Sequence, residues 1–332
     1  MHLEASTGWG GQEIRILRES VGMRARGHEV ILAVMAGAEL GKRARQAGLT
    51  VYELDFRRSA WWHSFWRLCR IFKQHAIEVV NTHSSLDAWL GGLVARWVGC
   101  KVVRTRHLST PIKRGLNSRL LYGKLADFVV TTCESIVETI VRQSGKERRF
   151  CRSVPTGIAA EHVDVKPEEV LAFRKQWGFS SKEFVVGTAC VMRSWKGIQD
   201  LLLAADRLRH IADLRWVVIG GGHAETYHAM AKELHLGGKV LLQAAYLRRP
   251  LIATATGGLG EVCLDQITGI LVSPFRSDQV AEAVLRLKES RSERERLGDR
   301  ARVRVVEHFL WQQTLDNMEQ IFLHVVGNSR AH

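Results

Sequence analysis

The sequence predicts an α/β protein of two domains, each built on a parallel sheet with helices on both faces. Three observations lead to this prediction. Short apolar runs rich in Val and Ile alternate with longer amphipathic segments along the chain, as βαβ units require. At 332 residues the chain is too long for one small core. Pro155 and Gly157 interrupt the pattern near its middle, where a domain boundary is expected.

The first domain is expected to span residues 1–157. Its strand-like runs lie near residues 2–5, 29–34, 50–54, 77–81, 101–105 and 128–131, with helical patterns between them. The first helical pattern, at about residues 12–25, follows a turn that contains Gly10 and Gly11. Two adjacent glycines exceed what a tight turn needs, which favours a close approach of the backbone to a ligand.

The second domain is expected to span residues 158–308, followed by a C-terminal helix within residues 309–332. We expect this helix, at about residues 311–326, to pack back across the domain junction. The second domain is incomplete near residues 237–250. Only residues 237–249 separate a helical pattern at 225–236 from the next strand at 250–254. A βαβ crossover takes at least about a dozen residues by itself, so about one strand or helix unit is missing.

Charge is shared unevenly between the two domains. The chain has a net charge of +14; residues 1–157 have a net charge of +12 and the remainder has +2. A basic domain suggests an anionic partner, and nucleic acid, an anionic membrane surface and a phosphorylated glycolipid all fit. No apolar run is long enough to cross a bilayer, and the six scattered cysteines are typical of reduced thiols in a cytoplasmic protein.

The most informative segment is the loop after the strand pattern at residues 184–189. It contains Arg193 and Lys196 and leads directly into a helical pattern. Two cations beside a helix N-terminus form a good receptor for a diphosphate. The simpler interpretation is an exposed Arg and Lys on an ordinary loop. Residues Gly220, Gly221 and Gly222 also follow a strand, and a turn and a ligand contact are equally consistent with them.

Together these motifs resemble the retaining glycosyltransferases of family four, which have the GT-B fold of two Rossmann-like domains facing a cleft. The likeness is greatest to bacterial members that build lipopolysaccharide and other surface polysaccharides. It covers nearly the whole chain and rests on seven motifs in the family's order. These are Gly10-Gly11-Gln12-Glu13, Val80-Asn81-Thr82-His83-Ser84, Val103-Arg104-Thr105-Arg106-His107, Val154-Pro155-Thr156-Gly157, Arg193-Ser194-Trp195-Lys196-Gly197, Ile219-Gly220-Gly221-Gly222 and Thr256-Gly257-Gly258-Leu259-Gly260-Glu261.

The resemblance implies roles for particular residues. His107 would lie beside the donor sugar as the catalytic residue. His83 and Glu261 would line the cleft. A family glutamate that binds the ribose is replaced here by Gln243, and a second glutamate near the donor sugar has no counterpart, because it belongs to the missing segment. The residues expected to bind the donor are Arg193, Lys196, Gly10, Gly11, Gly221 and Gln243.

The expected function is therefore a retaining, metal-independent glycosyltransferase of the hexosyltransferase type. It would need no cofactor and would transfer a sugar from a nucleotide-sugar donor to a saccharide or lipid-linked acceptor. The missing segment would impair its activity. The alternative is a non-catalytic remnant that only binds a nucleotide, a phosphate or a partner. An oxidoreductase is disfavoured because the glycine fingerprint for a dinucleotide is incomplete, and nucleic acid because no recognised binding module is present.

Residues 57–73 contain five aromatic residues and five cations, and their apolar side chains recur at helical spacing. The simpler interpretation is a helix packed on the sheet. The alternative is a helix end that rests on anionic lipid, which would place a cytoplasmic protein at the inner face of the cytoplasmic membrane as a peripheral protein.

Overall fold

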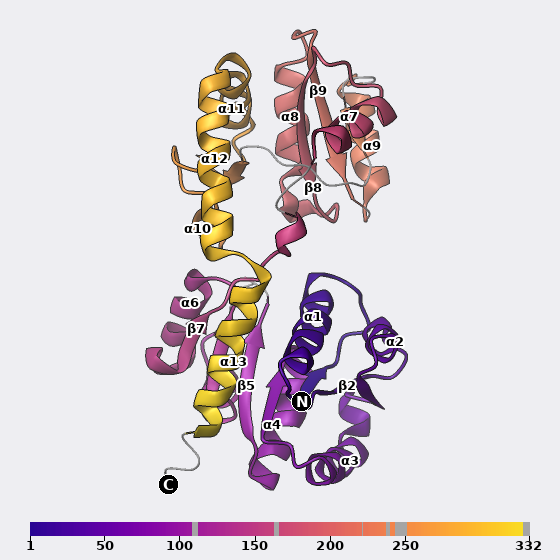
Figure 1. The fold of residues 1–332 in the computed structure, drawn as a ribbon, viewed down its shortest axis with the longest axis vertical. Helices are drawn as coiled ribbons and strands as arrows, with labels where there is room; N and C mark the ends of the chain where they lie inside the picture. Colours follow the sequence, from indigo (N-terminus) through magenta and orange to yellow (C-terminus); the bar gives the residue numbers. More distant parts are fainter. Residues whose placement is uncertain (108–111, 163–165, 221, 237–239, 243–250, 328–332) are drawn as a thin grey trace. The chain divides into compact units, whose positions relative to one another are not determined.

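The computed structural model describes residues 1–107, 112–162, 166–220, 222–236, 240–242 and 251–327. The chain divides into two compact units (Figure 1). Unit 1 comprises Met1–Gly157 together with Phe309–His332, and unit 2 comprises Ile158–His308. Each unit is an α/β structure, as expected.

Unit 1 contains one seven-stranded parallel sheet with the order β3-β2-β1-β4-β5-β6-β7. Its strands are β1 (His2–Glu4), β2 (Ile31–Met35), β3 (Thr50–Leu54), β4 (Val79–Thr82), β5 (Lys101–Arg106), β6 (Phe128–Thr131) and β7 (Cys151–Ser153). The sequence patterns identify the first six. They miss β7, which has only three residues and exposes Arg152, so it carries too short an apolar run to be recognised.

Helices cover both faces of this sheet. One face carries α1 (Gly11–Ala25), α2 (Glu39–Gln46) and α13 (Trp311–Gly327), and the other carries α3 (Trp61–Gln74), α4 (Ser85–Val98) and α6 (Glu134–Ser144). Shorter elements are η1 (Arg58–Ala60), α5 (Leu116–Ser118), η2 (Arg119–Lys124) and η3 (Arg148–Phe150). Neighbouring residues of a strand serve opposite faces: Val102 packs under α3 and α4, and Val103 packs under α13.

The last helix, α13, belongs to the core of unit 1. Its residues Leu315, Met318 and Ile321 are buried against Val103 of the sheet and Met23 of α1. Polar contacts strengthen this packing in unit 1. Arg26 pairs with Asp316 and Glu319 at 2.6 and 2.7 Å, and the amide of Gly157 donates to the hydroxyl of Thr314 at 2.9 Å. A side chain at position 157 would lie 2.4 Å from the carbonyl oxygen of Leu310, so only glycine permits this approach.

Unit 2 has two separate parallel sheets in the described part of the chain. The first has the order β10-β9-β8 and the second pairs β11 with β12. The strands are β8 (Phe184–Ala189), β9 (Leu214–Ile219), β10 (Val240–Leu242), β11 (Leu251–Thr254) and β12 (Gly269–Val272). The helices are α7 (Pro167–Gln176), α8 (Ile198–Arg207), α9 (Ala224–Glu233), α10 (Leu259–Val262), α11 (Ser277–Glu289) and α12 (Arg291–His308), with short turns η4 (Ala160–His162) and η5 (Ser194–Lys196).

The two sheets of unit 2 share a core although no backbone pairing joins them among the described strands. Phe184 of β8 and Ile252 of β11 pack in the same cluster, and α8 contacts α11. In the described part of the chain, the interruption between β8 and β11 means only that no strand pairing joins the sheet of β8 to the sheet of β11. Residues 243–250, between β10 and β11, belong to the segment 237–250 in which the sequence predicts a missing unit. Gly187 and Ala189 of β8 are exposed, which is unusual for a strand inside a doubly wound unit.

No helix in the described ranges is long and apolar enough to span a bilayer.

We predict that unit 1 depends on α13 for its stability. Ile321→Ala removes a side chain that is 2% exposed and should lower the free energy of unfolding by about 2–5 kcal/mol. Leu323→Ala, on the same helix but 58% exposed, is the matched control and should change it by less than about 0.5 kcal/mol. Urea unfolding measures the difference, and hydrogen exchange of β5 locates it in unit 1. Equal stability of the two variants would contradict the role of α13.

Candidate functional site

In unit 1, the candidate residues lie at the carboxyl ends of β1, β4 and β5, where open α/β sheets bind their ligands. Gly10 is the N-cap of α1, and its amide donates to the carboxylate of Glu13 at 2.9 Å. Nothing lies within 4 Å of a side-chain carbon placed at Gly11, and its backbone angle is not left-handed. The fold therefore does not require glycine at position 11. Open space beside a helix N-terminus is the setting in which a phosphate contacts backbone amides.

His83 and His107 are brought together, with a third histidine that the sequence motifs do not identify. Nδ1 of His83 lies 2.9 Å from Nε2 of His107, and Nε2 of His83 lies 3.0 Å from Nδ1 of His2. The rings of His2 and His83 are stacked, with centroids 5.2 Å apart. His2 and His83 are buried, and His107 is half-buried. We call these three residues the histidine chain.

All three imidazoles are neutral at physiological pH. Burial lowers the pKa of His2 to about 3. Burial also lowers the pKa of His83 well below its usual range, and its histidine neighbours add to the effect. The pKa of His107 is lowered well below its usual range by burial and then by the positive charges of Arg15 and Arg104. A neutral imidazole has one donor and one acceptor nitrogen, so the chain can polarise a hydroxyl but carries no charge.

Two buried pairs, each of an arginine and a carboxyl group, flank the histidine chain. Arg15 and Glu19, one turn apart on α1, approach to 3.6 Å, and Arg104 lies 3.7 Å from Asp87. Burial and then the nearby Glu4 raise the pKa of Asp87 to about 8. Sequence reasoning does not find these acids. Arg15 and Glu19 have the spacing of a solvent-facing helix pair, and Ser84-x-x-Asp87 is typical of a capping box.

In unit 2, Arg193 and Lys196 lie on the loop that leaves the carboxyl end of β8. The turn η5 and Gly197, with a φ of +69°, lead directly into α8. Both cations are exposed, and neither pairs with a carboxylate in the described ranges. The guanidinium of Arg193 lies over the ring of Trp195 at 5.3 Å. Two unpaired cations next to a helix N-terminus are available to an anionic ligand.

Gly220 and Gly222 have a structural reason to be glycine. Their φ angles are +145° and +109°, and a side-chain carbon at Gly220 would lie 1.8 Å from the carbonyl oxygen of Cys190. The turn also supports the cationic loop, because the amide of His223 donates to the carbonyl of Met192 at 3.1 Å. The turn interpretation therefore holds for these two glycines.

The other sequence candidates are less informative. Gly221 and Gln243 lie outside the described residues. Glu261 lies on α10, and its carbonyl oxygen accepts a hydrogen bond from Nε of Arg304 at 2.9 Å. Within the described ranges, no group of three His, Cys, Asp or Glu side chains is placed to hold a metal ion.

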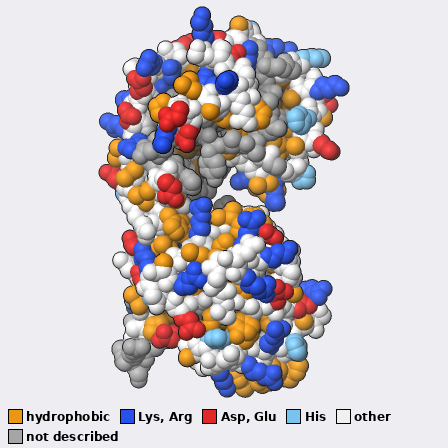
Figure 2. Space-filling view, turned by 45° about the vertical axis from the view of Figure 1, so that its right-hand side comes forward, with side chains coloured by type: hydrophobic (Ala, Val, Ile, Leu, Met, Phe, Trp, Pro, Cys, Tyr) orange, Lys and Arg blue, Asp and Glu red, His pale blue; other side chains and the backbone are white. Residues whose placement is uncertain are grey.

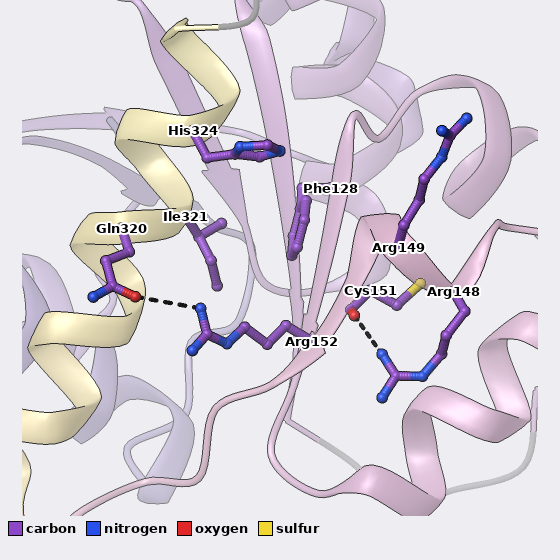
Figure 3. A pocket seen from close by; sticks show the side chains of 8 residues that line it. All are labelled: Phe128, Arg148, Arg149, Cys151, Arg152, Gln320, Ile321 and His324. Atoms are coloured by element: carbon purple, nitrogen blue, oxygen red, sulfur yellow. Dashed lines mark hydrogen bonds between the residues drawn. The ribbon is translucent and has the colours of Figure 1, made fainter.

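A separate cavity of about 710 Å³ lies in unit 1 between β6, β7, η3 and α13. None of the candidate residues lines it. Figure 3 shows that its arginines diverge, with Arg148 and Arg149 directed away from Arg152, whose Nη1 lies 3.4 Å from the amide oxygen of Gln320. The guanidinium groups therefore do not converge on one ligand position.

Family comparisons cover both units. Residues 9–162 match the family described as Glycosyltransferase Family 4, and residues 237–304 match the Glycosyl transferases group 1 family. The chain is 22% identical over 303 residues to N-acetyl-alpha-D-glucosaminyl L-malate synthase of Bacillus anthracis, covering 80% of this chain and 79% of that protein. It is 25% identical over 183 residues to Lipopolysaccharide 1,2-N-acetylglucosaminetransferase of Salmonella typhimurium, covering 54% and 43%.

The fold is shared with a solved structure of Anabaena HepE in complex with UDP. The TM-score is 0.84 with 15% identity, over 96% of this chain and 98% of that one. A likeness at this identity concerns the fold. Combined with the two family matches on units 1 and 2, it establishes that the chain belongs to the glycosyltransferases of the GT-B fold.

Proposed function

We propose that the chain transfers a sugar from a nucleotide-sugar donor to a saccharide or lipid-linked acceptor in the synthesis of a cell-surface polysaccharide or lipopolysaccharide. The observation that carries this proposal is the exposed Arg193 and Lys196 just before α8, which have no carboxylate partner among the described residues. Membership of the glycosyltransferases supports it. The similarity to a lipopolysaccharide N-acetylglucosaminetransferase and to a protein that binds UDP supports the substrate class.

The cationic loop has the chemistry that departure of a nucleoside diphosphate needs. As the bond between sugar and diphosphate breaks, negative charge grows on the diphosphate oxygens. Arg193 and Lys196 can stabilise that charge without a metal ion, because they are positively charged and have no carboxylate partner within the described ranges. We assign the donor diphosphate to this loop and include metal independence in the proposal.

Unit 1 provides a polar surface of different character. The space at Gly11 admits an acceptor or phosphate oxygen close to the backbone amides of α1. His107 is a neutral imidazole that can exchange a hydrogen bond with a sugar hydroxyl. We include transfer with retention in the proposal because of the resemblance to the retaining glycosyltransferases of family four.

The interruption between β8 and β11 favours weak transferase activity. It is also consistent with a second function, the binding of a nucleotide without catalysis. A chain that lacks part of its donor domain can bind a diphosphate through the β8 loop without holding the sugar. Isothermal titration with nucleoside diphosphates and nucleotide sugars tests this. Binding of both with turnover supports the enzyme, and binding of the diphosphate alone supports a non-catalytic remnant.

We predict that Arg193→Ala and Lys196→Ala each weaken nucleoside diphosphate binding by about 1–3 kcal/mol, because each removes a charge-assisted hydrogen bond. This corresponds to a dissociation constant about 5- to 150-fold higher. Arg209→Ala is the control, since Arg209 is an exposed arginine of the same unit whose guanidinium pairs with Asp206 at 2.8 Å. Titration calorimetry measures all three. If the two loop variants bind like the control, the diphosphate site is elsewhere.

We predict that turnover by the unmodified chain is low or undetectable. A donor sugar held loosely forfeits much of the roughly 7–11 kcal/mol that positioning supplies. The rates of donor hydrolysis and sugar transfer are measured for the unmodified chain and for a variant with a family-like strand and loop inserted between Lys239 and Val240. Turnover by the insertion variant should be faster than turnover by the unmodified chain. Rapid turnover by the unmodified chain would mean that another part of unit 2 holds the sugar.

We also propose that unit 1 rests on anionic lipid at the inner face of the cytoplasmic membrane. Four aromatic rings form a cluster on α3 and α4. The ring centroid of Phe65 lies 5.4 Å from that of Trp66 and 6.4 Å from that of Trp97, and the centroid of Trp62 lies 5.6 Å from that of Trp66. Trp62 and Trp97 are 77% and 68% exposed. The exposed Arg67, Arg70 and Lys73 also lie on α3. Figure 2 shows basic and hydrophobic side chains adjoining one another on unit 1.

We predict that the double variant Trp62→Ser/Trp97→Ser loses most of its binding to vesicles that contain anionic lipid. Interfacial Trp rings and nearby cations act together, and each cation contributes about 1 kcal/mol near such a surface. Trp195→Ser is the control, because Trp195 is an exposed tryptophan of unit 2. Flotation with neutral and with anionic vesicles separates the cases. Equal retention by both kinds of vesicle would exclude an electrostatic membrane contact.

A further inference from the structure

The histidine chain ends at a buried carboxylate. Nε2 of His2, the nitrogen not bonded to His83, lies 4.0 Å from Oε1 of Glu19. The order of groups is therefore Glu19, His2, His83 and His107. The first three are buried, and His107 retains partial exposure. The chain connects a buried charge on α1 with an accessible imidazole at the end of β5.

Neutral imidazoles allow only two arrangements of hydrogens along this chain. Each ring carries one N–H, and each of the two hydrogen bonds needs one donor and one acceptor. In the first arrangement the hydrogens lie on Nε2 of all three rings, so that His107 donates to His83 and His83 donates to His2. In the second they lie on Nδ1 of all three, and every donor is reversed. The state of one end therefore fixes the state of the other.

Burial raises the pKa of Glu19, and the charge and hydrogen bond of Arg15 and the hydrogen bond from Asn81 act against this shift. We assign Glu19 as the anionic partner of Arg15 on the following grounds. The guanidinium of Arg15 is buried and cannot lose its proton, and Glu19 at 3.6 Å is its counter-ion. The side-chain amide of Asn81 also donates a hydrogen bond to Glu19. The hydroxyl of Thr105 donates to Oδ1 of Asn81 at 2.7 Å, which turns the Asn81 amide so that its Nδ2 donates to Oε1 of Glu19 at 3.3 Å.

We infer that Glu19 sets the tautomer of His107 through His2 and His83, so that His107 carries its hydrogen on Nε2 and presents the lone pair of Nδ1 to a ligand. A negative Oε1 favours a hydrogen on the facing Nε2 of His2 at 4.0 Å and disfavours a lone pair there. This selects the first arrangement. His2 and His83 are positioning residues in this assignment, and neither needs to touch a ligand.

The assignment specifies what His107 recognises. An Nδ1 lone pair accepts a hydrogen bond from a hydroxyl and repels another acceptor such as a phosphate oxygen. The ligand class at this nitrogen is therefore a hydroxyl donor, and a sugar hydroxyl fits. This last step rests on the proposed function, whereas the tautomer itself does not.

Nitrogen-15 NMR of the full chain with labelled histidine tests the tautomer directly, since protonated and unprotonated ring nitrogens have well-separated signals. The unmodified protein should show His107 with hydrogen on Nε2. Glu19→Gln removes the charge, and His2→Phe removes the link to His83, so in both variants the population with hydrogen on Nδ1 should rise. His63→Gln, a change at an exposed histidine of α3 outside the chain, is the control and should leave the His107 signals unchanged.

If Glu19→Gln fails to fold because Arg15 loses its counter-ion, His2→Phe carries the test, with thermal unfolding as the check on folding. An Nδ1-protonated His107 in the unmodified protein would overturn the assignment. So would an Nε2 tautomer that survives in every folded variant. These measurements need no turnover. Addition of a nucleotide sugar to the same sample tests the proposed function separately, through shifts of the His107 signals.

Discussion

A buried positive charge organises unit 1. The guanidinium of Arg15 donates to the carbonyl of Val154 at 2.8 Å and to the hydroxyl of Thr156 at 3.0 Å, and it faces Glu19 one turn along α1. These contacts hold the first helix against the segment that follows β7. A buried ion must be compensated, so the positions of Glu19, Asn81 and Thr105 follow from that of Arg15.

Both units are α/β structures, but they differ in whether the charged groups of their candidate sites are buried or exposed. Unit 1 has a continuous seven-stranded sheet, and the charged groups beside its histidine chain are buried: Arg15, Glu19, Asp87 and Arg104. Unit 2 exposes its cations on a loop, with a glycine turn packed closely behind. Buried, neutral or paired groups suit hydrogen bonding to hydroxyls, and exposed, unpaired cations suit a diphosphate. This difference supports a separation of acceptor and donor chemistry between the units.

Much of the fold can be predicted from local patterns, because parallel strands buried on both faces form apolar runs that are easy to recognise. The strands β2, β4, β5 and β6 contain such runs, and the apolar spacing of the helix α13 is equally easy to recognise. Long-range polar contacts cannot be predicted in this way. His2 lies within a short apolar strand pattern, and its partner His83 is 81 residues away, so no spacing rule connects them. The pair of Arg15 and Glu19 is indistinguishable in sequence from an exposed helix pair.

The division of unit 2 into two sheets has a consequence for cooperativity. Backbone hydrogen bonds join β8 to β9 and β10, and β11 to β12, but the described strands of the two sheets are coupled only by side-chain packing, such as that of Phe184 with Ile252. Side-chain packing alone couples the local unfolding of two sheets less strongly than continuous backbone hydrogen bonding between their strands does. We therefore expect the part with β11, β12 and α12 to open more readily than β8 and the cationic loop, as a separate foldon of unit 2.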